Sequence, residues 1–168
     1  MKVDSFYKQS GLNLNESHEL AVSNCDHAVS FIEGPPGTGK TSVITTIVAK
    51  ALANAKGVIV LGQSNFSVKQ VYDSLMKNNI CTDEEMAVIV VKDHFKEHKG
   101  EYSLHYSRHS PARAYKQVLL CTLSKAKRIP RHLLMQFRNT SGEYVFRDMA
   151  ILYEGARISS LSFAEVLP

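Results

Sequence analysis

The chain has 168 residues, of which 44% are hydrophobic and 21% are charged, and its formal net charge at pH 7 is +4. This length suits one α/β domain with its own core and is too short for two full domains. No apolar run approaches the roughly 20 residues that a membrane helix needs, and the N-terminus does not resemble a secretory signal, so we expect a cytoplasmic or nuclear protein with no membrane partner.

Helices and strands are expected to alternate along the chain. Helical periodicity predicts helices over residues 15–27, 41–55 and 67–77. Apolar runs predict strands over residues 28–33, 57–62, 87–91, 117–122 and within 144–152, centred on 150–152. Residues 92–115 read as an irregular, basic segment. The pattern predicts the α/β class, with a mostly parallel sheet, helices on both faces, and ligands at the carboxyl ends of the strands.

A glycine-rich loop between the first strand and the helix over 41–55 is the most specific motif. Its residues fit the phosphate-loop pattern G-x-x-x-x-G-K-[ST] at every required position: Gly34, Pro35, Pro36, Gly37, Thr38, Gly39, Lys40 and Thr41. Such a loop points backbone N–H groups at phosphate oxygens, and the helix dipole adds positive potential. Lys40 would reach the β- and γ-phosphates, and the Thr41 hydroxyl would ligate Mg²⁺. We therefore expect the chain to bind a nucleoside triphosphate, with ATP and Mg²⁺ as its cofactors.

Five segments, one of which contains the phosphate loop, occur in a fixed order along the chain: Leu14–His18, Ile32–Thr41, Ser64–Val68, Val118–Thr122 and Phe146–Ala156. This order resembles the motifs of superfamily 1 helicases of the senataxin and nonsense-mediated-decay type. The resemblance implies the first RecA-like domain of such a helicase over residues 14–168, preceded by an N-terminal extension over 1–13. It implies that His18 lies at the adenine base of ATP. It also implies a single-stranded RNA or DNA partner, with Ser64, Asn65 and Thr122 as nucleic-acid contacts.

Three positions depart from the pattern that this resemblance implies. His18 stands where the family has a glutamine that reads the adenine edge, and Lys69 replaces an acidic residue. Tyr153 stands where the Walker B carboxylate should help to hold Mg²⁺, and a phenol is a poor substitute near neutral pH. Glu154 is retained at the position of the catalytic carboxylate, with Lys40 as the other catalytic candidate. We therefore expect weak hydrolysis of ATP or none.

The resemblance also implies that the domain is truncated after the Walker B region. In the family, the next strand lies between the Walker A and Walker B strands, and a second RecA-like domain follows it. We expect either a fragment of a longer helicase or a truncated relative, which needs a second RecA-like domain in cis or in trans. A missing central strand would leave unpaired backbone groups inside the sheet.

Several other features leave alternatives open. Between Lys92 and Arg138 there are eleven Lys or Arg residues and three acidic ones, which fits a phosphate-attracting face or a solvated basic loop. The same segment holds histidines four residues apart, which we read as surface residues in preference to metal ligands, and tyrosines that would stack on bases or cover the sheet edge: His94, His98, His105, His109, Tyr102, Tyr106 and Tyr115. Three dispersed cysteines without a CxxC pair indicate neither disulfides nor a zinc site.

Three functions remain on these grounds. The first is an ATP-binding helicase-like domain with impaired hydrolysis. The second is a non-catalytic nucleotide- and RNA-binding module, or a truncated helicase remnant. The third is another class of phosphate-loop ATPase, such as a hexameric AAA-type machine, whose loop has the same pattern.

Overall fold

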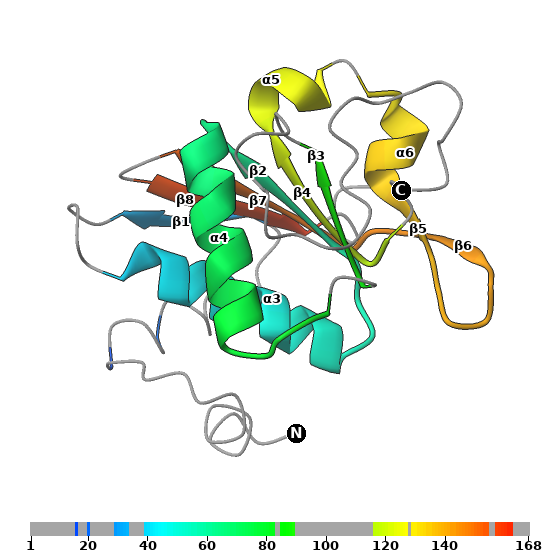
Figure 1. Cartoon of the computed structure of the whole chain (residues 1–168), viewed down its shortest axis with the longest axis horizontal. Helices are drawn as coiled ribbons and strands as arrows, with labels where there is room; N and C mark the ends of the chain where they lie inside the picture. Colours follow the sequence, from blue (N-terminus) through cyan, green and yellow to red (C-terminus); the bar gives the residue numbers. More distant parts are fainter. Residues whose placement is uncertain are drawn as a thin grey trace.

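The computed structural model describes residues 16, 20, 29–33, 39–82, 85–89, 116–127, 129–154 and 157–162 (Figure 1). Strands in this part of the chain are β1 (Val29–Glu33), β2 (Val58–Gly62), β3 (Met86–Ile89), β4 (Val118–Thr122), β5 (Gln136–Arg138), β6 (Tyr144–Phe146), β7 (Met149–Glu154) and β8 (Arg157–Ser162). The helices are α3 (Lys40–Ala53), α4 (Asn65–Lys77), α5 (Leu123–Ala126) and α6 (Arg131–Met135). Within the described residues, no helix is long and apolar enough to cross a membrane.

The main sheet has six strands in the order β1-β8-β7-β2-β4-β3. Strands β7, β2, β4 and β3 are parallel to their neighbours, and they form the part of the sheet that the sequence predicted. Strand β8 is antiparallel to both β1 and β7, so β1 and β7 point the same way across it. The prediction of an α/β fold with a mostly parallel sheet is therefore confirmed.

Strand β8 occupies the position that the sequence led us to expect to be empty. It lies between β1, which precedes the phosphate loop, and β7, which ends at the Walker B position. Only Gly155 and Ala156 separate β7 from β8. A connection of two residues can join antiparallel neighbours but cannot make the long crossover that a parallel strand requires. The gap is thus filled by the returning chain, and the backbone of β7 is paired on both sides.

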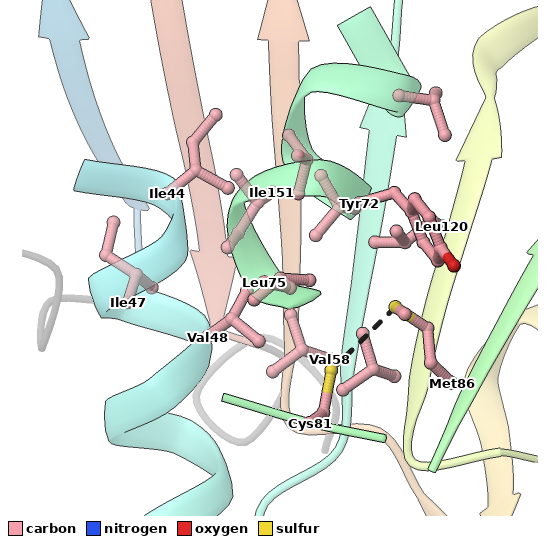
Figure 2. Close-up of a cluster of buried hydrophobic side chains, with 14 of the residues drawn as sticks. Ile44, Ile47, Val48, Val58, Tyr72, Leu75, Cys81, Met86, Leu120 and Ile151 are labelled. Carbon is pink, nitrogen blue, oxygen red and sulfur yellow. Dashed lines mark hydrogen bonds between the residues drawn. The ribbon is translucent and has the colours of Figure 1, made fainter. Parts of the chain in front are cut away.

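The side chains of the parallel strands divide into two buried layers, because successive residues of a strand point to opposite faces. One layer contains Val58, Val60, Leu120 and Ile151, and α3 and α4 pack on it, as Figure 2 shows. The other layer is smaller and includes Ile59, Leu119, Cys121 and Ala150. Ala126, Ile129 and Leu134, from α5 and the segment around α6, cover this second layer, so helices lie on both faces of the sheet.

A second, two-stranded antiparallel sheet pairs β5 with β6. The sequence analysis placed residues 144–152 in the region of one strand, and the structure divides them between β6 and β7. The division occurs at Arg147 and Asp148, whose backbone N–H groups donate to the carbonyls of Met135 and Gly57. These bonds turn the chain from the small sheet into the large one. The helix predicted over residues 15–27 and the basic segment over 92–115 lie largely or wholly outside the described residues.

Candidate nucleotide and nucleic-acid site

The described residues of the predicted site lie along the carboxyl edge of the parallel strands. Strand β1 ends at Glu33, immediately before the phosphate loop, and β7 ends at Glu154. Neighbouring strands lie about 4.8 Å apart, so the ends of β1 and β7 are separated by about 10 Å, with β8 between them. Gly62 at the end of β2 is the register partner of both Tyr153 in β7 and Thr122 in β4.

The described part of the phosphate loop is its junction with α3. Gly39 has φ 78 and ψ 28, a left-handed conformation that glycine adopts without steric cost. Gly39, the N-cap residue, provides no side-chain cap for α3, and the first turn of this helix contains no acidic residue. The uncapped N–H groups and the helix dipole therefore favour an anion at this helix start. Residues Gly34 to Thr38 and His18 lie outside the described residues.

Lys40 and Thr41 stand at the first two positions of α3. The Lys40 side chain is 8% exposed, and Thr41 is half-buried. One turn later, the Thr45 hydroxyl lies 2.8 Å from the Thr41 carbonyl oxygen, to which it donates, and 2.7 Å from the Ser74 hydroxyl of α4. Thr45 is completely buried, so this contact fixes α3 against α4 inside the core. The position of Lys40 and Thr41 thus depends on the packing between two helices.

Tyr153 is a core residue in the structure. Its side chain is 8% exposed and belongs to the same buried cluster as Ile44 and Ile151. Its carbonyl oxygen accepts a hydrogen bond of 3.1 Å from the backbone N–H of Gln63, which ties the end of β7 to the loop after β2. The described residues therefore present a buried phenol where the family pattern has a metal-binding carboxylate.

Asp148 directly precedes β7, so it lies at the end of that strand opposite to Glu154. Its Oδ2 accepts a 3.0 Å hydrogen bond from the backbone N–H of Gly57. Asp148 thus stabilises the amino edge of the sheet. It cannot replace the missing carboxylate beside Glu154, because the length of β7 separates the two residues.

The three predicted nucleic-acid contacts meet at the ends of β2 and β4. Ser64 is exposed and caps α4, because its Oγ accepts from the backbone N–H of Ser67 at 3.2 Å. Asn65 is half-buried and begins α4. Thr122 is only 4% exposed, and its hydroxyl caps α5 by accepting from the backbone N–H of Lys125 at 3.3 Å. The Thr122 hydroxyl therefore stabilises the start of α5, and its contact with nucleic acid stays a prediction.

Two residues at this edge were missed by the sequence analysis. Phe66 is 69% exposed beside Ser64 and Asn65, which is unusual for a large apolar side chain. Arg157 begins β8, and its Cα is in register with both Glu33 and Glu154. The signal for Arg157 was the short Gly155-Ala156 connection, which forces the chain to return along β7.

The described residues contain no group of three or more His, Cys, Asp or Glu that could hold a metal ion. The histidine pairs of the basic segment and Cys25 lie outside that part of the chain. Cys81 and Cys121 are both buried. Burial raises the pKa of the Cys121 thiol to about 12, although the nearby Lys125 acts in the opposite direction. Such a thiol is not a nucleophile at neutral pH.

Comparison with known proteins agrees with this geometry. A family model described as "AAA domain" matches residues 13–133. The DNA polymerase alpha-associated DNA helicase A of Schizosaccharomyces pombe is 32% identical over 77 residues, which are 46% of this chain and 12% of that protein. An uncharacterized ATP-dependent helicase of Methanocaldococcus jannaschii is 37% identical over 68 residues, which are 39% of this chain and 10% of that protein.

A third relative is the mouse DNA-binding protein SMUBP-2, which is 30% identical over 71 residues, or 42% of this chain and 7% of that protein. The chain therefore spans a small fraction of the length of the curated relatives that it matches. The matched family covers the phosphate loop, β2, α4 and β4, which are the elements that form the carboxyl edge. The chain belongs to the AAA domain family, and its phosphate-loop domain is of the helicase-like, ATP-binding type.

Proposed function

We propose that the chain holds ATP with Mg²⁺ through residues 34–41 and hydrolyses it weakly or not at all. The observation that carries this proposal is the arrangement at one sheet edge of an uncapped α3 start, with Lys40 and Thr41, and the end of β7, with a buried Tyr153. Lys40 would contact the β- and γ-phosphates, and the Thr41 hydroxyl would ligate Mg²⁺. When bound, Mg²⁺ would neutralise the charge that develops on the transferred phosphoryl group.

We expect weak hydrolysis because the Walker B position lacks the negative charge of a carboxylate. Glu154 would orient the attacking water, as the resemblance implies. The adjacent carboxylate that would help to hold Mg²⁺ is replaced by Tyr153, whose ring packs in the core. Phosphoryl transfer depends on positioned charge and metal far more than on covalent chemistry. Loss of one metal-binding carboxylate therefore reduces turnover more than it reduces the binding of ATP.

The proposed second ligand is single-stranded RNA or DNA at the ends of β2 and β4. Exposed Ser64 and half-buried Asn65 are the residues that we assign to it, with Thr122 supporting the start of α5 next to them. The relatives that are named as helicases or as a DNA-binding protein support this partner class. We infer a cytoplasmic or nuclear location and a second RecA-like domain, in cis or in trans, for any strand-separating activity.

The test is to measure ATP binding and ATP turnover on the purified chain, with and without Mg²⁺ and a single-stranded RNA. Lys40→Ala and Thr41→Ala are the site variants, and Lys77→Ala is the matched control, because Lys77 is exposed at the far end of α4. We expect the site variants to weaken ATP binding at least tenfold and the control to leave it unchanged. Thermal melts of all three variants show whether each one is folded.

The outcomes separate the candidate functions. Lys40-dependent binding without turnover supports the proposal, and it favours the non-catalytic module that the burial of Tyr153 already suggests. Turnover that RNA stimulates would contradict the proposed impairment and would mean that Tyr153 is tolerated. Absence of ATP binding to the folded wild-type chain would overturn the proposal as a whole. A ring-sized oligomer on a sizing column would favour the hexameric class of ATPase.

A further inference from the structure

The β5–β6 hairpin has one face toward the body of the protein and one face toward solvent. Its register pairs Phe137 with Val145 between two other cross-strand pairs, Gln136 with Phe146 and Arg138 with Tyr144. Phe137 is 3% exposed, so the central pair faces inward. Because residues alternate across a strand, the two outer pairs share the opposite face. We call the set Gln136, Arg138, Tyr144 and Phe146 the hairpin face.

The hairpin face carries two aromatic rings that the fold does not bury. Tyr144 is 56% exposed and Phe146 is 60% exposed. The only other exposed large hydrophobic residues in the described part of the chain are Leu20 and Phe66. Two residues along a strand correspond to about 7 Å, so the two rings stand side by side on one strand. Apolar side chains that remain exposed together mark a binding surface more often than isolated ones do.

The face is held in shape by its own turn. The Asn139 side-chain oxygen accepts from the backbone N–H groups of Ser141 and Glu143, at 3.0 and 2.9 Å. Gly142 has φ +81, a left-handed conformation that suits glycine. The Nε of Arg138 donates to the Gly142 carbonyl at 3.1 Å, and its guanidinium lies 5.9 Å from the centre of the Tyr144 ring. A cation and two rings are therefore positioned before any ligand arrives.

Charge distinguishes the kind of ligand that this face fits. Five Lys or Arg residues lie between Thr122 and Phe146, against one acidic residue, Glu143: Lys125, Lys127, Arg128, Arg131 and Arg138. Lys127, Arg131 and Arg138 are exposed. This segment leaves the carboxyl edge after β4 and reaches the hairpin through α5 and α6, which Figure 1 shows as the yellow helices. A basic track with aromatic rings fits a polyanion with flat bases better than an apolar protein surface.

We propose that the hairpin face is a stacking platform for single-stranded nucleic acid. Tyr144 and Phe146 stack on bases, and Arg138 contacts the phosphate backbone. Aromatic residues on sheet strands stack on unpaired bases in this way in other RNA-binding sheets. The platform rests on the proposed function for its ligand class, but it lies on a separate sheet from Ser64 and Asn65. The hairpin lies toward the amino edge of the main sheet, because Phe137 packs against Gly57 just before β2, so a bound strand would pass from the carboxyl edge along the basic segment to reach it.

The chain contains no tryptophan, so a single substitution gives a specific optical probe. In the Phe146→Trp variant, a base that stacks on the new indole ring quenches its fluorescence. The probe ligand is a fluorescently labelled single-stranded oligouridine, whose binding is measured by anisotropy in parallel. The matched control is Lys77→Trp, which places an indole at the exposed end of α4. We expect quenching of the Phe146→Trp variant to follow binding, and the control to remain unquenched.

Affinity measurements with the single tyrosine and phenylalanine variants complete the test. Tyr144→Ala and Phe146→Ala should each raise the Kd for the oligouridine about tenfold, whereas Tyr144→Phe, which keeps the ring, should leave it within about twofold. Thermal melts confirm that the variants are folded. Unchanged affinity in both alanine variants, or an unquenched Phe146→Trp variant in the bound complex, overturns the platform alone and leaves Ser64 and Asn65 as contacts.

Two other outcomes would also reject the platform. If the folded wild-type chain binds no oligouridine at low salt, the platform and the proposed nucleic-acid partner fail together, whereas ATP binding, measured separately, stands. If sedimentation shows that the chain self-associates and that Tyr144→Ala and Phe146→Ala abolish the association, the face is an interface between copies of the chain. Salt dependence adds a check on charge, because Arg138→Gln should lower the slope of log Kd against log salt by about one.

Discussion

The two edges of the main sheet use polar side chains in opposite ways. At the amino edge, Arg147 is 1% exposed, and its guanidinium nitrogens donate to the carbonyl oxygens of Gln136 and Lys116 at 3.0 and 2.6 Å. Asp148 accepts from the backbone of Gly57 beside it. Burial lowers the pKa of Arg147 to about 9, which still leaves the guanidinium protonated at neutral pH. These polar groups are committed to the protein itself.

At the carboxyl edge, polar groups cap the helices that begin there and remain near the surface. Ser64 is exposed while it caps α4, and α3 begins without any side-chain cap. Backbone N–H groups at an uncapped helix start need a partner, which a phosphate can supply. The contrast teaches that buried polar groups hold the sheet together at the amino edge, whereas polar groups stay near the surface at the carboxyl edge, where we propose that ATP binds. The predictions below challenge that division, beginning with the largest effect.

Arg147→Ala should remove the hydrogen bonds that the Arg147 guanidinium makes at the amino edge of the sheet. It leaves two buried carbonyl oxygens without their donor and opens a cavity, so we expect the free energy of unfolding to fall by about 3–5 kcal/mol. Urea denaturation measures the loss. Arg138→Ala is the control, because Arg138 is exposed on the same hairpin, and it should cost less than about 1 kcal/mol. An equal loss in the free energy of unfolding for Arg147→Ala and Arg138→Ala would contradict the structural role that we assign to the amino edge.

Tyr153→Asp tests whether the carboxyl edge can recover its metal-binding acid. The substitution restores the family's carboxylate, but it also removes a ring from the core and buries a charge, at a cost of about 2–4 kcal/mol. Tyr153→Phe keeps the ring and should cost about 1 kcal/mol or less. Urea denaturation of both variants measures the costs. A stable Tyr153→Asp variant would show that the side chain at this position reaches solvent and the site, contrary to its burial here.

Two glycines allow the same substitution to be compared at both edges. A Cβ on Gly57 would lie 2.4 Å from the Phe137 ring, and one on Gly62 would lie 2.7 Å from a methyl group of Val68. Each alanine variant should lose about 1–3 kcal/mol of stability, because neither site has room for a methyl group. Both variants should also weaken nucleic-acid binding, Gly62→Ala through Val68 and the first turns of α4 beside Ser64, and Gly57→Ala through Phe137 and the hairpin face. Anisotropy at matched folded fractions measures both effects. Unchanged binding by Gly62→Ala would contradict the contact at Ser64, and unchanged binding by Gly57→Ala would contradict the hairpin face.

Cys121 gives the smallest and most local effect. Its pKa of about 12, against 9.0 for a free thiol, reduces the thiolate fraction at pH 8 about a thousandfold. Iodoacetamide should therefore modify Cys121 in the folded chain only through transient opening, and rapidly after unfolding in urea. Mass spectrometry of the peptide that contains Cys121 measures both rates. Fast modification of the folded chain would mean that the sheet opens readily beneath the carboxyl edge.

Much of the carboxyl edge could be predicted from sequence because its signals are local. The spacing of Gly34, Gly39 and Lys40 identified the phosphate loop, and continuous apolar runs located β2 and β4. The sequence predicted a helix that begins at Ser67, whereas α4 begins two residues earlier, at Asn65. The earlier start is due to Ser64, which caps the helix in a way that the amphipathic pattern alone does not reveal. Each of these features depends on residues that are close together in the chain.

Other features required the tertiary structure because they depend on residues far apart in sequence. The sequence by itself determined a phosphate-loop α/β domain of helicase type, and it predicted a site at the carboxyl edge. Only the tertiary structure decided that β8 fills the place between β1 and β7, that Tyr153 packs in the core, and that Arg147 locks the amino edge. Strand pairing and burial are settled by what the rest of the chain brings alongside, which a local pattern cannot encode.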